Sequence, residues 1–344
     1  MRRILLTVVA VALLGGVSGA LWLRGWWTSA LPIPDEGVLV FIEPGASFGG
    51  VVQRLEGRGV LRRPDLFKLA ARWTAADANM RSGEYLIPPE SSPRSLLALL
   101  QSDNTVRYSV TLPEGITLAQ ALQLLHEAPV LKASLQGASD PQLQALVAPA
   151  PATEGLFLPE TYQYQRGDSD LDVLRQANRL MLETLGSLWE QRDIGLIFRE
   201  PYEALILASI VERETGVPGE RGQIAGVFTR RLRAGMRLQT DPSVIYGLGP
   251  RFDGNLTRAH LRDESNLFNT YRHHGLPPTP ICLPGRDALA AALAPEEGDA
   301  LYFVARGDGT HAFSATLEEH EDAVRAYQLQ RRDDYRSSPR AEPR

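Results

Sequence analysis

The segment 201-PYEALILASIVERETG-216 decides the fold of the larger part of this chain. Pro201 suits the first turn of a helix, and the residues from Ala204 to Val211 are apolar on nearly every helical face. Because a helix that is apolar all round has to be buried, the segment predicts a core helix that other elements surround. This helix ends on two carboxylates, Glu212 and Glu214.

The position of these two carboxylates predicts acid–base chemistry. Desolvation raises a carboxyl pKa toward neutrality, and the negative end of a helix dipole raises it further, which suits a general acid. Residues two apart on a helix point about 200° apart, so Glu212 and Glu214 cannot share one face of a cleft. We expect one to be functional and the other structural. The alternative is that both mark the solvated end of a core helix, paired with Arg213 or Arg221.

Apolar spacing elsewhere predicts further helices, a hairpin and a tail. The three-four spacing from Leu171 to Trp189 is typical of a long helix, which opens a second, mainly helical domain. The other elements predicted in this region are a helix over 224–232 that ends near Gly235, hairpin strands over 301–304 and 312–314, a helix over 318–328, and a frayed, charged tail over 331–344.

The N-terminal half contains a β-turn-α unit twice. Residues 38–42 predict a strand, which is followed by a turn at Gly45 and a helix that Ser47 caps. Gly115 and Thr117 take the corresponding places in a second unit. Together the two units predict a small α+β module, and the sequence leaves open whether it is a packing scaffold or a glycan-binding module.

Uncharged residues from Ile4 to Leu23 follow two arginines at the N-terminus and match the thickness of a bilayer core. Trp22, Trp26 and Trp27 stand where an aromatic belt would hold a spanning helix at the far interface. A cleavable signal peptide is the alternative, because small residues near the end of the run suit a signal peptidase. We expect an uncleaved anchor with a cytoplasmic N-terminus and the remaining chain on the other side.

The composition is that of a globular protein and excludes several classes. With 44% hydrophobic and 22% charged residues among 344, a mainly disordered, collagenous or multi-span membrane protein is excluded. The chain has 36 basic against 41 acidic residues and no basic block, so we expect no nucleic-acid partner. Cys282 lies in an apolar segment that suits a buried thiol, and the adjacent His273 and His274 would point apart. We expect no metal site and no cofactor.

Three further stretches are candidates for a functional site, and the first of them, 154–162, mixes carboxylates with aromatic residues in a way that suits a sugar-binding groove. Its alternative interpretation is a surface loop pinned by Phe157 and Tyr162. Aromatic faces stack on the C–H surfaces of pyranoses while carboxylates bind their hydroxyls. The stretch 154–162 is too irregular for a helix or a strand. The stretch 236–247 contains Thr240, Asp241 and Ser243, and the alternative role of any of these three is to cap a short helix. The third is a polar loop followed by a rigid segment, over 269–278.

These motifs in their order resemble those of one family. The endolytic murein transglycosylases of the MltG (YceG-like) family are similar to this chain in the runs 208-ASIVERET-215, 237-RLQTDPSVIYG-247, 269-NTY-271 and 275-GLPP-278, and in 154-EG-155 with 159-PETY-162. The resemblance covers essentially the whole chain, including the anchor and the N-terminal module, which in the family is LysM-like.

The resemblance implies a lyase that cuts peptidoglycan strands between N-acetylmuramic acid and N-acetylglucosamine and leaves a 1,6-anhydromuramoyl end. One carboxyl group suffices, first as acid and then as base. Glu214 is the expected acid, because Glu followed by a small hydroxyl residue resembles the Glu-Ser signature of other lytic transglycosylases; Glu212 is the reserve. By resemblance the cleft is lined by Glu154, Glu160, Tyr162, Gln239, Asp241, Tyr246, Asn269 and Tyr271, although the family often carries Asp at the position of Glu160.

The expected fold class is α+β. It comprises an N-terminal membrane anchor helix (1–27), a small LysM-like α/β module (28–150), a larger mainly helical catalytic domain with a short β-hairpin (151–330), and a disordered tail (331–344). The expected location is the bacterial inner membrane, with the catalytic domain periplasmic. Expected partners are peptidoglycan glycan strands, the membrane, and peptidoglycan synthases or division proteins. The alternatives are a catalytically silent peptidoglycan-binding scaffold and a hydrolase in which Asp241 or Glu154 activates water.

Overall fold

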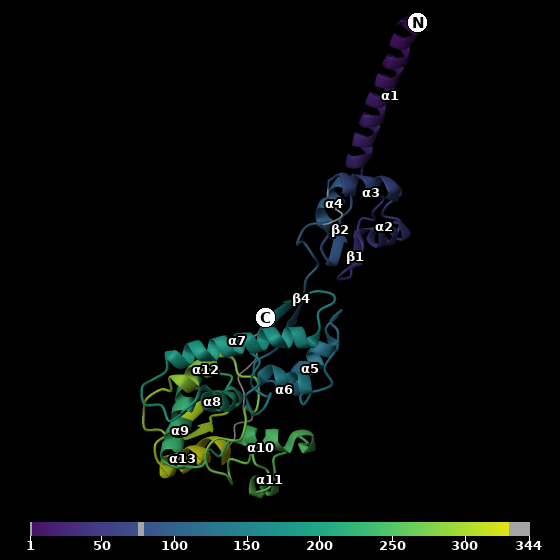
Figure 1. Cartoon of the computed structure of the whole chain (residues 1–344). Coiled ribbons are helices and arrows are strands. Elements are labelled where there is room, and N and C mark those ends of the chain that lie inside the picture. Colours follow the sequence, from purple (N-terminus) through teal and green to yellow (C-terminus); the bar gives the residue numbers. More distant parts are fainter. Residues whose placement is uncertain (1, 75–78, 330–344) are drawn as a thin grey trace. The chain divides into compact units, whose positions relative to one another are not determined.

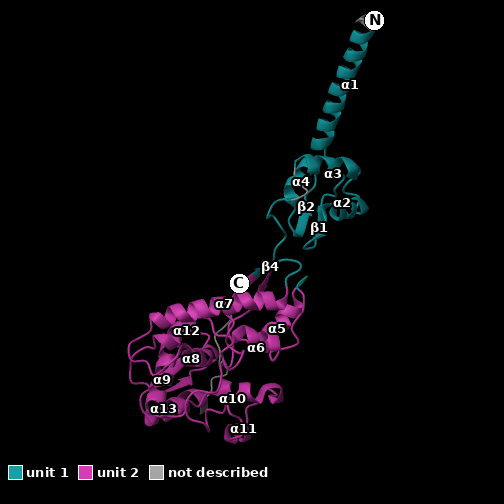
Figure 2. Ribbon diagram, in the orientation of Figure 1, with its two compact units in different colours: residues 1–108, 129–131, 163–168 teal, residues 109–128, 132–162, 169–344 magenta. Residues whose placement is uncertain are grey.

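The computed structural model describes residues 2–74 and 79–329, which form two compact units (Figure 2). Unit 1 consists of residues 1–108, 129–131 and 163–168, and unit 2 of residues 109–128, 132–162 and 169–344. The tail predicted over 331–344 lies outside the described residues. The functional division at residue 150 stays a prediction, because units defined by packing need not coincide with functional domains.

Unit 1 begins with a long apolar helix, α1 (Arg2–Thr28). Its segment Ile4–Thr28 has a mean hydropathy of 2.4 and is long and apolar enough to cross a membrane. The elements that follow are β1 (Val38–Ile42), α2 (Phe48–Gly57), α3 (Pro64–Trp73), β2 (Gly83–Ile87) and α4 (Pro93–Leu100) (Figure 1). The strand predicted over 38–42 is confirmed.

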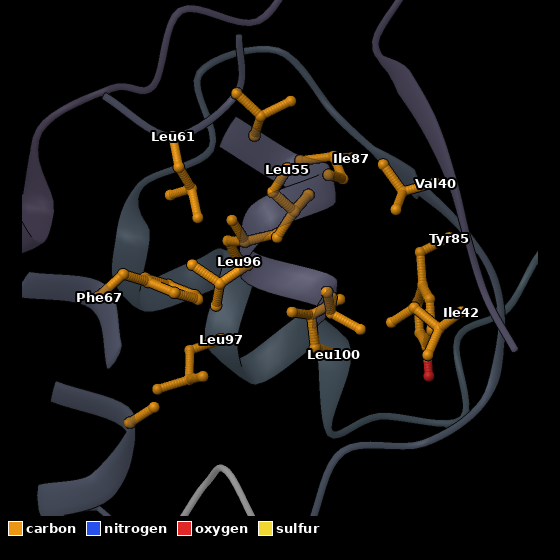
Figure 3. Packing of buried hydrophobic residues seen from close by; sticks show 14 residues of the cluster. Val40, Ile42, Leu55, Leu61, Phe67, Tyr85, Ile87, Leu96, Leu97 and Leu100 are labelled. Atoms are coloured by element: carbon orange, nitrogen blue, oxygen red, sulfur yellow. The ribbon is translucent and has the colours of Figure 1, made fainter. Parts of the chain in front are cut away.

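The antiparallel pair β1–β2 and the helices beside it enclose the core of unit 1 (Figure 3). Residues alternate along β1, so that Val40 points into the core while Leu39 is exposed. Phe67 of α3 fills the core from the other side. Trp26 and Trp27 pack against the same cluster, so the end of α1 is held against the core of unit 1.

The predicted β-turn-α repeat is confirmed. Gly45 and Gly115 have φ values of 79° and 76°, a left-handed conformation that a side chain disfavours. Two residues later, Ser47 and Thr117 accept a backbone N–H from the first turn of the helix with their side-chain oxygens. The same turn-and-cap sequence therefore starts α2 and α5 (Leu118–Glu127).

Helix α8 (Pro201–Glu214) is the core helix of unit 2, and all of its residues from Ala204 to Val211 are buried. It packs against α7 (Asp170–Glu190), α9 (Arg221–Arg233), α10 (Asp241–Leu248) and α12 (Arg286–Leu293) (Figure 1). Other elements of unit 2 are α5, α6 (Pro141–Val147), η1 (Pro218–Glu220), η2 (Gly249–Arg251), α11 (Arg258–Arg262), the hairpin strands β5 (Tyr302–Ala305) and β6 (His311–Ser314), α13 (Leu317–Val324) and η3 (Arg325–Leu329).

The predicted mixture of an N-terminal apolar helix and a mostly helical body with a short hairpin is confirmed. Two local predictions differ from the structure. The helix predicted over 318–328 changes to a π-helical turn after Val324. Strand β4 (Thr161–Tyr164) begins inside the stretch 154–162 that was expected to be irregular, because it pairs with β3 (Tyr108–Thr111), a partner distant in sequence.

Ser209 is the polar residue within the buried run of α8. Its hydroxyl donates to the carbonyl of Ile206 over 2.7 Å and accepts the backbone N–H of Ile281 over 3.0 Å. The thiol of Cys282 donates to the Ser209 carbonyl over 3.2 Å, so the predicted buried structural thiol is confirmed. These hydrogen bonds join the segment around Cys282 to the core helix.

We expect Ser209→Ala to lower the free energy of unfolding by about 1–3 kcal/mol, because the buried N–H of Ile281 loses its acceptor. Urea denaturation of the full chain measures the change. Ser187→Ala, at an exposed position of α7, is the matched control and should stay within about 0.5 kcal/mol of the wild type. Equal effects of the two substitutions would contradict this account of α8.

Candidate active site

Glu214 is the last residue of α8 and lies at the wall of a cavity of about 600 Å³. This volume is within the range of small-molecule sites. Of the residues that the sequence analysis singled out, Gln239, Asp241 and Tyr271 line the same cavity. The buried helix therefore delivers one of its two carboxylates into an open site, together with three other predicted side chains.

Burial raises the pKa of Glu214 to about 7. The Thr240 hydroxyl and the Arg231 guanidinium favour the charged form and limit this rise, whereas the Asp241 carboxylate adds to it. The negative end of the α8 dipole acts in the same direction as burial. Glu214 is therefore partly protonated near neutral pH, which is the requirement for a general acid that must later act as a base.

A network of hydroxyl groups fixes one oxygen of the Glu214 carboxyl group. The hydroxyl of Thr240 donates to Oε1 of Glu214. The backbone N–H of Thr240 donates to the hydroxyl of Thr270 over 3.0 Å, and that hydroxyl lies 2.9 Å from the hydroxyl of Ser243. Oε1 accepts this hydrogen bond, which leaves Oε2 as the oxygen available to exchange a proton with a bound substrate.

Thr240 occupies the position before the first residue of α10, but its side chain makes no capping hydrogen bond. The alternative interpretation of this threonine as a helix cap is therefore wrong. Its side chain turns to Glu214 because its backbone is held by Thr270, a residue of another loop. A sequence pattern typical of a helix start does not reveal such a partner.

Arg231 of α9 places a buried positive charge at the cavity wall. Its Nε donates to the carbonyl of Leu301 over 2.6 Å, and its Nη1 donates to the carbonyl of Leu238 over 2.8 Å. The guanidinium carbon lies 5.1 Å from the centre of the Tyr302 ring. Burial lowers the pKa of Arg231, yet a guanidinium stays charged at neutral pH. This charge favours the carboxylate form of Glu214.

Asp241 and Tyr271 form a polar pair beside Glu214. The Tyr271 hydroxyl donates to Oδ1 of Asp241 over 2.6 Å, and burial, followed by this bond, raises the pKa of Tyr271. Gln239 has a φ of 54°, which is rare outside glycine, and its N–H donates to the carbonyl of Thr270 over 3.2 Å. Such backbone strain is common at functional sites. These groups can hydrogen-bond the hydroxyls of a sugar.

The hairpin β5–β6 and α13 supply an aromatic wall of the cavity. The rings of Tyr302 and His320 stack with centres 5.1 Å apart, and Phe303 meets His311 edge-on at 5.4 Å. Burial lowers the pKa of His320, so its ring is neutral at pH 7. The sequence predicted this hairpin but did not assign it to the site, because no local signal connects it with the end of α8.

Glu212 has different partners from Glu214. Its Oε2 accepts the N–H of Gly285 over 2.9 Å, and its Oε1 lies 3.5 Å from the guanidinium of Arg221. Arg221 also lies 3.7 Å from Glu114. The predicted divergence of the two carboxylates is confirmed. Glu212 joins α8 to neighbouring segments of unit 2, and its role as the reserve acid stays a prediction.

Glu154 and Tyr246 form a second buried pair. Oε1 of Glu154 accepts the N–H of Leu118 over 2.9 Å at the start of α5, and Oε2 accepts the Tyr246 hydroxyl over 3.2 Å. Burial raises the pKa of Glu154 to about 7. Neither residue lines the cavity of Glu214. Contact of this pair with a substrate stays a prediction.

Three other predicted cleft residues have local partners. Tyr162 is buried and donates its hydroxyl to the carbonyl of Leu158 over 2.5 Å. Glu160 is exposed and accepts the N–H of the next residue over 2.8 Å. Asn269 is buried, and its Oδ1 accepts the N–H of Tyr271 over 3.1 Å, so it shapes the loop that carries Tyr271. Their contact with a substrate stays a prediction.

Within residues 2–74 and 79–329, no group of three or more His, Cys, Asp or Glu side chains is placed to hold a metal ion. The site thus consists of a half-buried carboxyl group with a raised pKa, a hydroxyl that orients it, a carboxylate–phenol pair and an aromatic wall. This arrangement places a carboxyl group with a raised pKa and a second carboxylate, that of Asp241, at the wall of the same cavity.

The chain belongs to the YceG-like family, whose sequence profile matches residues 40–326. The resemblance inferred from the motifs is confirmed. The chain is 28% identical over 313 residues to an endolytic murein transglycosylase of Bacillus subtilis (strain 168), with 84% of each chain covered. It is 26% identical over 336 residues to an endolytic murein transglycosylase of Streptococcus pneumoniae serotype 2 (strain D39), with 86% of this chain and 60% of that protein covered.

A crystal structure of a YceG-like protein from Listeria monocytogenes at 2.6 Å resolution has a similar fold, with a TM-score of 0.52 and 27% identity. The superposition covers 84% of this chain and 99% of that chain. The similarity therefore extends over nearly the whole of the chain in that crystal structure.

Glu214→Gln should make the protein more stable at pH 8 and leave its stability nearly unchanged at pH 4. The pKa of Glu214 is raised from 4.5 to about 7 in the folded state, so the stability linked to its proton is present below pH 4.5 and is lost as the pH rises through 7. Glutamine stays neutral throughout. The gain at pH 8 is roughly 1–3 kcal/mol after allowance for partial exposure.

Urea denaturation at the two pH values measures this difference. Glu183→Gln, which removes an exposed carboxylate from α7, is the control and should show no comparable dependence on pH. If the stability gained by Glu214→Gln at pH 8 does not exceed that at pH 4, the pKa of Glu214 is not raised in the folded state.

Thr240→Val should raise the pKa of Glu214 above about 7, because the hydroxyl that favours the carboxylate is removed while side-chain shape is kept. Thr240→Ser keeps the hydroxyl and should leave the pKa close to the wild-type value. NMR titration of carboxyl-labelled glutamate measures both variants. Equal pKa values in the valine and serine variants would refute the orienting role of Thr240.

Proposed function

We propose that this protein is an endolytic peptidoglycan lytic transglycosylase that uses Glu214 as its acid and base. The observation that carries the proposal is a partly protonated carboxyl group at the wall of a cavity, with one oxygen held by Thr240. The names of the Bacillus and Streptococcus relatives support the reaction class. The substrate is a glycan strand of alternating N-acetylglucosamine and N-acetylmuramic acid.

In the first half of the reaction, Oε2 of Glu214 gives its proton to the glycosidic oxygen. The bond from that oxygen to C1 of N-acetylmuramic acid breaks, and the leaving sugar departs with a hydroxyl group. The Glu214 carboxylate that remains is stabilised by the Thr240 hydroxyl and the Arg231 charge. Asp241 and Tyr271 hydrogen-bond sugar hydroxyls and so position the glycosidic oxygen beside Glu214.

In the second half, the C6 hydroxyl of the same N-acetylmuramic acid attacks C1. The Glu214 carboxylate takes the hydroxyl proton, the new C1–O6 bond closes the 1,6-anhydro ring, and the acid is restored. No water is consumed. The reaction therefore needs only one group that both donates and accepts a proton, and a pKa of about 7 is suited to both steps.

A hydrolase acting on the same substrate is the second candidate. Asp241 favours it, because this carboxylate lines the same cavity as Glu214 and a hydrolase needs a second carboxylate to activate water or attack C1. The hydrogen bond from Tyr271 occupies one oxygen of Asp241, which is better suited to holding a substrate than to activating water. The chemical form of the new chain end separates the two reactions.

We further propose that α1 spans the bacterial inner membrane once, with its N-terminus cytoplasmic and unit 2 in the periplasm. The β1–α2–α3–β2 order of unit 1 and its two-stranded antiparallel sheet support a LysM-like module that binds glycan. Peptidoglycan synthases or division proteins are the proposed protein partners. A catalytically silent scaffold is a further alternative, and it predicts no cleavage.

The test is digestion of purified, uncrosslinked glycan strands by the full chain in detergent, with mass spectrometry of the products. Wild type should produce 1,6-anhydro ends, and Glu214→Gln should lower the rate by at least about 100-fold, because general acid–base catalysis contributes on this scale. Glu183→Gln is the control and should keep wild-type activity.

Each other outcome has a distinct meaning. Reducing ends would identify a hydrolase, and intact strands would identify a scaffold. Full activity of Glu214→Gln together with loss of activity in Glu212→Gln would transfer the catalytic role to Glu212.

The pH dependence gives an independent prediction. Because Glu214 must be protonated in the free enzyme, kcat/KM should fall about tenfold per pH unit above a pKa of about 7. Thr240→Val should move this fall to higher pH and lower kcat, and Thr240→Ser should restore both. An unchanged pH profile in the valine variant would contradict the link between Thr240 and the catalytic acid.

A further inference from the structure

Helix α3 of unit 1 is unusual among the described helices outside α1 because large apolar side chains face outward along it. Leu69 and Trp73 are 59% and 84% exposed, whereas Phe67 and Ala71 on the opposite side are buried in the core. With 100° per residue, positions 66, 69 and 73 form one stripe. The helix is therefore anchored to unit 1 by one face and presents an apolar stripe on the other.

A positive charge accompanies this stripe. Lys68 and Arg72 lie beside it on α3, and Arg62 and Arg63 directly precede the helix, with Asp65 as its acidic residue. Arg62, Lys68 and Arg72 have no ion-pair partner among residues 2–74 and 79–329. An exposed apolar stripe with flanking basic residues is the pattern of a helix that lies in a membrane interface.

The start of α3 lies directly beside the end of α1. The guanidinium carbon of Arg63 is 5.1 Å from the centre of the Trp22 ring. A cavity of about 380 Å³ is lined by Trp26 of α1, by Ser29, which follows α1, and by Arg62 and Arg63. Figure 1 shows α3 at the end of unit 1 from which α1 leaves.

The C-terminal end of α1 packs against the rest of unit 1. Trp26 and Trp27 pack on the core, and the backbone N–H of Leu31 donates to the carbonyl of Ser91 over 2.7 Å. Tryptophans of this kind belong at the level of the lipid headgroups. A membrane that contains α1 therefore has its surface at the depth where α3 begins.

We propose that α3 docks on the surface of the membrane that α1 spans, with Leu69 and Trp73 in the interface and with Arg62, Arg63 and Arg72 bound to anionic phospholipid headgroups. The inference rests on the proposed membrane-spanning role of α1. The occupant of the exposed face is a bilayer, because the basic charge complements anionic lipid and the start of α3 lies beside the end of the spanning helix.

The test uses the full chain in lipid vesicles with a fluorophore on one introduced cysteine, since the native Cys282 is buried. Leu69→Cys reports on α3, Leu13→Cys reports on α1, and Leu39→Cys is the matched control, an exposed apolar position of β1 in the same unit. Lipids that carry a nitroxide near the headgroup quench a fluorophore that lies in the interface. Lipids that carry the nitroxide near the end of the acyl chain quench the label at 13, which lies in the middle of the apolar segment of α1.

In vesicles that contain phosphatidylglycerol, the label at 69 should lose most of its fluorescence and the label at 39 should lose almost none. Charge reversal by Arg62→Glu with Arg63→Glu, or replacement of phosphatidylglycerol by phosphatidylcholine, should reduce the quenching at 69 several-fold and leave that at 13 unchanged. This lipid dependence distinguishes headgroup binding from simple proximity to the bilayer.

Two results would overturn the docking of α3 and leave the spanning role of α1 unaffected. One is quenching at 13 without quenching at 69, which would assign the exposed face of α3 to a glycan or a protein. The other is equal quenching at 39 and 69, which would mean that unit 1 is immersed without a preferred face. Absence of quenching at 13 would instead refute the spanning role of α1, and the docking of α3 with it.

Discussion

The carboxyl group of Glu214 stands at the end of a helix that is buried along most of its length, and this position sets its chemistry. Removal from water raises its pKa to about 7, and the buried hydroxyl of Thr240 fixes one of its oxygens. The core of unit 2 and the candidate active site are therefore built from the same helix. Changes in the packing of α8 should affect stability and proton transfer together.

The surroundings of Glu214 balance opposite demands. A general acid needs an environment that disfavours charge, whereas the carboxylate left after proton transfer needs stabilisation. Burial and the Asp241 carboxylate disfavour the charged form of Glu214, and the Thr240 hydroxyl and the Arg231 guanidinium stabilise it. A pKa near neutrality is the result of this balance, and it allows one group to serve both halves of the proposed reaction.

Glu212 and Glu154 show why a buried carboxyl group is not in itself a catalytic one. Glu212 is tied to Gly285 and Arg221, and Glu154 accepts a backbone N–H at the start of α5. Both connect elements of unit 2 that are distant in sequence. What distinguishes Glu214 is the open cavity in front of it, since a proton donor must reach its substrate.

The sequence alone determined the elements that depend on local patterns. The apolar run of α8, the repeated glycine and cap at the starts of α2 and α5, and the long N-terminal helix follow from periodicity, turn chemistry and length. The divergence of Glu212 and Glu214 follows from helix geometry. Ordered motifs identified the family, and four of the ten predicted site residues, Glu214, Gln239, Asp241 and Tyr271, line one cavity.

Only the tertiary structure decided which partners these residues have. It joined Thr240 to Glu214, brought Arg231 and the β5–β6 hairpin to the cavity, and placed Glu154 against the start of α5. The physical reason is that burial and hydrogen bonding depend on segments far apart in the chain. Local patterns specify the faces of helices and strands, whereas the contacts that shift a pKa or orient a proton form only when those faces meet.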